Sequence, residues 1–194
     1  MKSLDYDLGY ITAGLEILEM YLLSDEVFWA MNANPPKGES EYPRLTLDYL
    51  LLARTRLKGR QLSPDQKDQV EAAIARLDYY CIKWRVAWEG KARQCYQVRE
   101  RMWRNFILEY QDNPLDNADR YTYEVRVRAM LELLIPELGR QLGDEKNLLP
   151  GLDSFLRKIL VPSKFIWESE IQAGFPEHIF WFLYGKLPSN FNNR

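Results

Sequence analysis

Histidine is almost absent from this chain, which has one histidine among its 194 residues. A catalytic mechanism that needs an imidazole base would have to use His178, in the stretch "FPEHIF". No metal-binding partner lies three or four residues from His178, and the chain has no Glu-x-x-His pair of a di-iron bundle. We therefore expect His178 at the surface or capping a short helix, and the sequence predicts no metal site and no cofactor.

Cysteine is nearly as scarce, with two residues in the chain. Cys81 and Cys95 fall in one predicted helix, where fourteen residues separate them by about 21 Å. A disulfide needs Cα atoms about 6 Å apart, so these two cannot pair with each other in that helix. We interpret both as small buried hydrophobic residues of a protein in a reducing compartment.

Long apolar runs are also lacking. No stretch approaches the roughly 20 apolar residues of a membrane helix, and the N-terminus does not have the pattern of a secretory leader. Together with the cysteines, these absences predict a soluble, cytoplasmic protein that does not contact the membrane.

Motifs of common enzymes are missing as well. The chain has no glycine-rich phosphate loop, no Gly-x-Ser-x-Gly turn and no Cys-x-x-Cys pair. Enzymes can work without such motifs, so their absence favours a non-catalytic role and leaves catalysis open.

Aromatic residues, by contrast, are plentiful, at 13% of a chain that is 46% hydrophobic. A chain of this length can bury one sizeable core, and aromatic rings supply large apolar surfaces to it. We predict a single domain over residues 1–194.

Apolar residues recur at spacings of three and four over most of the sequence, which is typical of amphipathic helices. The main predicted helices cover residues 4–32, 44–59, 64–111 and 121–143. Prolines and glycines interrupt the rest, which predicts short helices. The predicted fold is all-α: an irregular bundle of about four main helices around one long aromatic-rich helix, with short C-terminal helices wrapped on it.

The long helix has a well-defined start, because Ser63, Pro64 and Gln66 have the pattern of a capping box with proline at the first helical position. A continuous helix over residues 64–111 would be on the order of 70 Å long, so it either projects from the body or breaks. Gly90 is the natural place for a break, although one glycine does not compel it.

Charge is uneven along the chain. Residues 1–50 carry three basic and nine acidic side chains, and residues 51–110 carry thirteen basic and seven acidic ones. We interpret this as internal complementarity, with the acidic first helix beside the basic middle one. The alternative is a basic surface for an acidic partner.

The stretch from Lys83 to Phe106 interleaves aromatic and basic residues. On a helical wheel its apolar residues form one stripe: Trp84, Trp88, Cys95, Val98, Met102, Trp103 and Phe106. Its basic residues lie nearly opposite: Lys83, Arg93, Arg101 and Arg104, with Lys91 at the margin. A binder of single-stranded nucleic acid needs cations beside exposed rings on one surface, so this separation disfavours nucleic-acid binding.

Arg85 and Arg99 lie inside or at the edge of the apolar stripe, where a guanidinium needs a partner. The favoured interpretation is an ion pair with an acidic residue of another helix. The candidates are Glu16, Glu19, Glu124 and Glu132. The alternative is a pocket between helices, in which Arg85 or Arg99 beside Trp84 and Trp88 binds an anionic ligand.

The aromatic stretch "HIFWFLYGKLP" near the C-terminus contains Phe180, Trp181 and Tyr184. It is either a segment docked on the bundle or an anchor that binds a protein partner.

Three functions follow from these observations. The leading hypothesis is a non-catalytic protein-interaction or assembly module, which binds a partner or self-associates. The alternative is a binding protein or enzyme for a small anionic molecule, through Arg85 or Arg99. The third is nucleic-acid binding through the basic face of the long helix.

Overall fold

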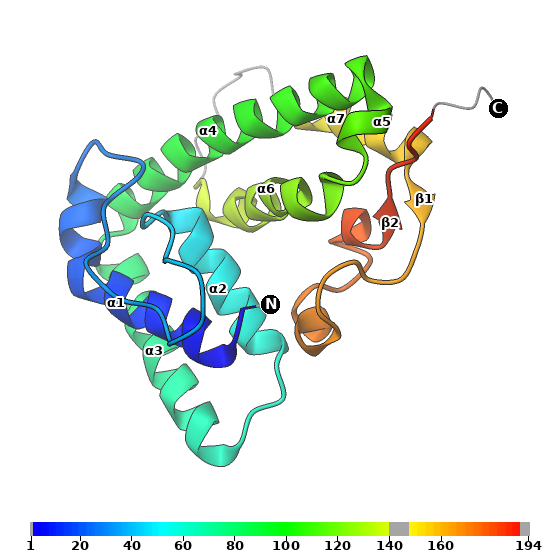
Figure 1. Ribbon diagram of the computed structural model, residues 1–194. Coiled ribbons are helices and arrows are strands. Elements are labelled where there is room, and N and C mark those ends of the chain that lie inside the picture. The colour runs from blue at the N-terminus through cyan, green and yellow to red at the C-terminus, as the bar shows by residue number, and fades with distance from the viewer. Residues whose placement is uncertain (1, 140–147, 191–194) are drawn as a thin grey trace.

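The computed structural model describes residues 2–139 and 148–190 (Figure 1). It confirms the all-α fold, because the regular secondary structure of the described residues is helical apart from one two-stranded sheet and an isolated bridge. The α-helices are α1 (Leu4–Leu23), α2 (Leu47–Gly59), α3 (Pro64–Lys83), α4 (Arg85–Asp112), α5 (Pro114–Asn117), α6 (Tyr121–Leu134) and α7 (Leu149–Ile159). The 3-10 helices are η1 (Ile135–Glu137), η2 (Ser169–Gly174) and η3 (Trp181–Leu183). The strands are β1 (Val161–Pro162) and β2 (Gly185–Lys186).

Helix α4 is the organising element, as the aromatic-rich sequence predicts. It contacts every other α-helix of the described chain, and its largest contact is with α6. Trp88 and Trp103 on its inner face are fully buried. Helix α2 packs in turn against α1, α6 and η2, so that it connects the N-terminal helices to the C-terminal segment.

The first two predicted helices are shorter than their apolar patterns suggest. Helix α1 ends at Leu23, because the Ser24 hydroxyl and backbone N–H both donate to the carbonyl of Tyr21. The following loop is held by a short bridge between Trp29 and Leu45. Helix α2 then begins after Thr46, whose side chain accepts a hydrogen bond from a backbone N–H of its first turn.

The long predicted helix does break, but at Trp84 and not at Gly90. The capping box at Ser63 is present as predicted. Trp84 has φ −114° and ψ 34°, and Figure 1 shows α3 and α4 running in different directions on either side of it. The bend lets Leu77 of α3 and Trp88 of α4 both reach the core, which a straight helix of this length could not do. At Gly90 a Cβ atom would meet nothing within 4 Å, so no contact there requires glycine.

The C-terminal third also departs from the prediction. The helix expected over residues 121–143 ends at Leu134 and tightens into η1 around Pro136, and residues 140–147 lie outside the described chain. Strands β1 and β2 pair antiparallel, Val161 with Lys186. Strands of two residues leave no alternating pattern, which is why the sequence did not indicate them.

The uneven charge resolves into contacts within the molecule, as the sequence analysis favours. The acidic first segment pairs with the basic middle one at Glu16–Arg76 (3.1 Å), Glu19–Lys83 (3.3 Å) and Asp48–Arg99 (2.6 Å). Part of the positive charge of residues 51–110 is therefore neutralised by acidic side chains of residues 1–50.

Among the helices that the structure describes, none combines the length and the apolar character needed to cross a membrane.

Candidate functional site

Arg99 is held in a buried ion pair. Its Nε donates to Oδ2 of Asp48 at 2.6 Å, and the carboxylate of Asp48 is fully buried. The guanidinium also lies 5.5 Å from the ring centroid of Phe28. The pairing with an acid of another helix is confirmed, but the acid is Asp48 of α2 and not one of the four glutamates expected. Both groups are engaged with each other, which leaves little of Arg99 for a ligand.

Arg85 lies in a different environment, because 47% of its side chain is exposed. Its Nε donates to Glu89 at 2.6 Å, and this hydrogen bond raises the pKa of Arg85. Trp88 is buried with its indole N–H donating to Glu137 at 2.9 Å, and Trp84 is half-buried. Arg85 and Arg99 are thus about 21 Å apart along α4, and the structure does not bring the four predicted ligand-binding residues into one pocket.

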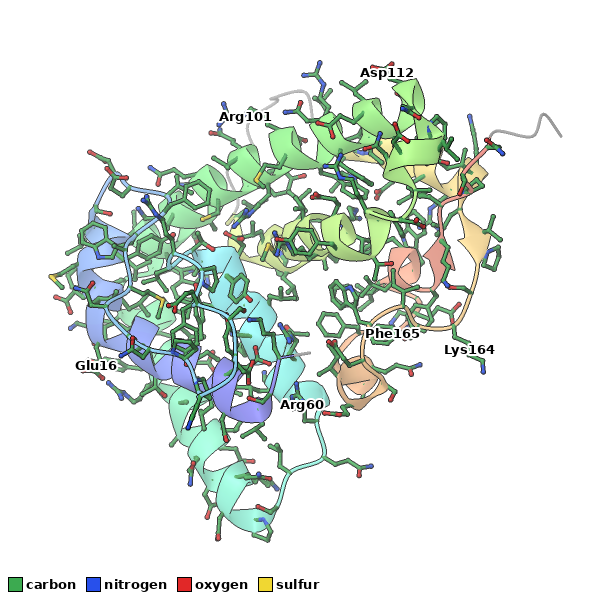
Figure 2. The ribbon with its side chains drawn as sticks, viewed as in Figure 1. Glu16, Arg60, Arg101, Asp112, Lys164 and Phe165 are labelled. Carbon is green, nitrogen blue, oxygen red and sulfur yellow. The ribbon has the colours of Figure 1, made fainter. Side chains whose placement is uncertain are left out.

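The burial of Lys91 was not predicted by the helical wheel. It was placed at the margin of the solvated face, yet it is buried, and its Nζ donates to the backbone carbonyls of Ser24 (2.7 Å) and Glu26 (2.9 Å). Burial lowers the pKa of Lys91. The basic face is therefore interrupted, although Arg101 and Arg104 are exposed, and Figure 2 shows Arg101 on the outer side of α4.

The C-terminal aromatic stretch is docked on the body. Phe180 is buried, and Trp181 is half-buried with the guanidinium of Arg157 3.7 Å from its ring centroid. The hydroxyl of Tyr184 donates to the carbonyl of Phe175 at 2.8 Å. Most of the surface of these three residues, which were predicted to bind a partner, is covered by contacts within the chain.

His178 and the cysteines offer little for catalysis. His178 is exposed in a turn, and no group of three potential metal ligands occurs in the described ranges. Both cysteines are free, and Cys81 is only half-buried where full burial was expected. Burial raises the pKa of Cys95 to about 12, so its thiol stays protonated and unreactive at neutral pH.

An exposed apolar stripe runs along α3, and it was not predicted from the sequence. Its residues are Ala72, Ala75, Tyr79 and Ile82 of α3 and Val86 in the first turn of α4, and we call it the α3 seam. Tyr79 is 59% exposed, Ile82 78% and Val86 82%. The spacing of three, four and three residues places Ala72, Ala75, Tyr79 and Ile82 on one side of α3, as in a coiled-coil heptad. The signal was present in the sequence, but an apolar stripe is normally assigned to a core.

The opposite face of α3 supplies that core contact. Val70, Ala73 and Leu77 are buried there against the body. The α3 seam thus points away from the molecule, and Figure 1 shows α3 at the periphery, with its first turns extending beyond the other helices. Val86 belongs to the seam although it follows the bend at Trp84.

Charged residues line the two sides of the α3 seam in an ordered way. On one side lie Arg76 and Lys83, whose partners are Glu16 and Glu19 of α1. On the other side lie two acidic residues, Glu71 and Asp78. The side chains of Arg76 and Asp78 are 52% and 51% exposed, so they remain open to further contacts.

A cleft of about 480 Å³ opens between α2 and α3 beside the seam. Its lining includes Leu57, Leu62, Val70 and Ile74, and Ala75 of the seam also belongs to it. Exposed apolar surface therefore continues from the seam into a groove, which is a feature of protein-binding surfaces.

No protein-family model matches this chain, and no curated protein or solved structure matches it. The function must therefore be argued from the chain's own surfaces.

Proposed function

We propose that this chain is a non-catalytic protein-interaction module that self-associates, with the α3 seam of one copy packing against the α3 seam of a second. The observation that carries this proposal is the row of exposed apolar residues from Ala72 to Ile82 with heptad spacing along α3, continued by the exposed Val86 just after the bend. In coiled coils, residues with this spacing insert as knobs into holes on a facing helix. Burying a side chain such as Ile82 or Val86 is worth about 1.5–3 kcal/mol, which is a strong reason for a partner.

The charges beside the seam favour a second copy in parallel orientation. With Ala72 and Tyr79 in the first heptad position, Glu71 and Asp78 take the last position, and Arg76 and Lys83 take the fifth. In a parallel pair each last-position residue faces the fifth-position residue five places further along the other helix. Glu71 then meets Arg76 of the second copy, and Asp78 meets Lys83 of the second copy.

An antiparallel pair would place like charges together, acidic beside acidic and basic beside basic. The order of charges along α3 therefore distinguishes the two orientations, and it favours the parallel one. The contact repeats itself by twofold symmetry, since the same surface serves both copies.

The contact should be modest in size. Helix α4 turns away after Trp84, so the seam offers about two heptads to its partner. Short interfaces of this kind give reversible association. The exposed Met20 and Leu23 lie near the same end of α3, because their neighbour Glu19 pairs with Lys83, and they can widen the contact.

The test is sedimentation velocity of the full chain over a range of concentrations, comparing the wild type with Ile82→Glu and Leu115→Glu. Leu115 is 66% exposed on α5, away from the seam, and serves as the matched control. We expect a concentration-dependent dimer for the wild type and for Leu115→Glu, and a monomer for Ile82→Glu. A wild type that stays monomeric at high concentration, or equal dimerisation of all three chains, would show that the seam does not bind a second copy.

We also propose that the chain works in the cytoplasm, because its two free cysteines suit a reducing compartment. Nucleic-acid binding is not part of the proposal, since Lys83 pairs with Glu19 and Arg93 donates to the carbonyl of Leu138.

A further inference from the structure

A second cleft, of about 180 Å³, lies between α2, α6 and the C-terminal segment. Arg56 of α2 and Arg126 of α6 both line it, together with Tyr49, Tyr123 and Trp167. It is distinct from the α3 seam and shares no residue with it. Two guanidinium groups beside three aromatic rings are an arrangement that binds anions with a flat group attached.

Arg56 is buried yet incompletely paired. The residue is 8% exposed, and its Nε has no hydrogen-bond partner in the described chain. Its one ion pair is with Asp7, at 3.4 Å between Nε and Oδ2. A buried guanidinium normally uses most of its five donors, so Arg56 has donors to spare beside the cleft.

Arg126 is also free of carboxylate partners within residues 2–139 and 148–190. Its guanidinium lies 3.6 Å from the ring centroid of Tyr123, and the group is half-buried. The indole of Trp167 is fixed in place, because its N–H donates to the carbonyl of Thr122 at 3.0 Å. Stacking on Tyr123 holds the guanidinium plane before any ligand arrives, which lowers the entropic cost of binding.

The buried acid next to Arg56 is only a partial counter-ion. Asp7 is fully buried, and neither of its carboxylate oxygens has a hydrogen-bond partner in the part of the chain described. Burial raises the pKa of Asp7 to about 7, although Arg56 and Arg60 act to lower it. A carboxyl that is partly protonated at neutral pH leaves Arg56 with net positive charge.

Arg60 does not compete for the same ligand. It lies 3.8 Å from Asp7 and pairs with Glu170 of η2 at 2.6 Å. Figure 2 shows Arg60 at the end of α2, on the side that faces the C-terminal segment. Lys2 and Glu168 also line the cleft and carry opposite charges, so the net positive charge there comes from the two arginines. A single anionic group is therefore favoured.

We propose that this cleft binds a small phosphate ester, with its phosphate between Arg56 and Arg126 and its flat organic group against Tyr123 and Trp167. Arginine suits this role because its planar fork of N–H groups matches the oxygens of phosphate in pairs. The volume of about 180 Å³ admits a phosphate with one small ring and excludes a nucleotide held entirely inside.

Isothermal titration calorimetry of the full chain with phenyl phosphate tests this proposal, with inorganic phosphate as the comparison ligand. The variant Arg126→Gln removes one guanidinium and no ion pair, and Arg104→Gln, at an exposed position of α4, is the matched control. We expect saturable binding of phenyl phosphate, about tenfold weaker binding to Arg126→Gln, and unchanged binding to Arg104→Gln. Inorganic phosphate should bind more weakly than phenyl phosphate.

A second variant tests the role of Arg56 by changing its buried partner Asp7 and leaving the arginine in place. Asp7→Asn takes away the competing carboxylate and should tighten phenyl phosphate binding by about tenfold at pH 8, where Asp7 is otherwise ionised. Absence of binding at millimolar phenyl phosphate, or equal affinity of the wild type, Arg126→Gln and Asp7→Asn, would overturn the proposal. Binding of inorganic phosphate as tight as that of phenyl phosphate would overturn the role of the aromatic rings.

Discussion

Helices α3 and α4 follow each other in the chain with one residue between them, yet they meet their surroundings in opposite ways. Helix α4 has ten buried residues among its 28, and α3 has three among its 20. The outward side of α4 carries Arg101 and Arg104, whereas the outward side of α3 carries Tyr79 and Ile82. Helix α4 therefore packs mainly inside the molecule, whereas α3 has a continuous exposed apolar stripe that the proposed second copy would cover.

The two helices also differ in the environment of one arginine in each, which is buried in α4 and exposed in α3. Arg99 of α4 is an internal structural residue, because Asp48 neutralises it in the core. Arg76 beside the α3 seam is half exposed, and its pair with Glu16 is at the surface. Breaking a buried pair of the first kind costs stability, whereas a surface pair of the second kind contributes little to it and can be used in the proposed association.

The largest expected effect concerns the α4 side. Replacing Arg99 with Met leaves the buried carboxylate of Asp48 without its counter-ion, and we expect the free energy of unfolding to fall by about 3–5 kcal/mol. Urea denaturation followed by circular dichroism measures it. Arg101→Met, at an exposed position of the same helix, should change the value by less than about 0.5 kcal/mol. Equal stability of Arg99→Met and Arg101→Met would contradict the structural role of the pair.

A smaller effect is expected on the α3 side, in association rather than stability. Glu71→Arg alone places arginine against Arg76 of the second copy, and Arg76→Glu alone places glutamate against Glu71 of the second copy, besides removing the surface pair of Arg76 with Glu16. Each should weaken the dimer by about 1–2 kcal/mol because two such contacts change in a symmetric pair. Sedimentation equilibrium gives the dissociation constants.

The same two variants test the orientation of the helices. An equimolar mixture of Glu71→Arg and Arg76→Glu should form a heterodimer, and the chain with both changes should dimerise like the wild type. In an antiparallel pair, the double variant would still place acidic beside acidic and basic beside basic side chains, so the two changes together would not restore dimerisation. Failure of both restorations would therefore contradict the parallel arrangement.

The smallest expected effect sharpens the position of the bend. Because a Cβ atom at Gly90 meets no neighbour and the residue is inside α4, Gly90→Ala should raise the free energy of unfolding by up to about 1 kcal/mol. Thermal unfolding measures the change. A loss of stability would mean that Gly90 has a conformational role that the bend at Trp84 does not account for.

Sequence reasoning recovered the parts of this fold that local chemistry decides. The capping box at Ser63 and the helical periodicity of α1 and α4 depend on neighbours within a few residues, and the structure confirms them. The need of Arg99 for an acidic partner also followed from the apolar side chains around it.

The parts that were missed depend on residues far apart in the chain. The bend at Trp84 follows from how α3 and α4 share one core, and the choice of Asp48 follows from where α2 lies. Lys91 lies near the edge of the apolar stripe, and its burial depends on the carbonyls of the loop after α1, which accept hydrogen bonds from its ammonium group. The α3 seam was hidden because exposure cannot be read from periodicity alone.

The C-terminal segment has a consequence for how this protein is made. Tyr121 donates to the carbonyl of Phe182 at 2.6 Å, and Tyr110 donates to the carbonyl of Pro188 at 2.8 Å. The acceptors of these two hydroxyls are synthesised 61 and 78 residues after the tyrosines themselves. We therefore expect the central helices to remain incompletely packed during synthesis, with apolar surface open to chaperones, until the C-terminal segment has emerged and docked on them.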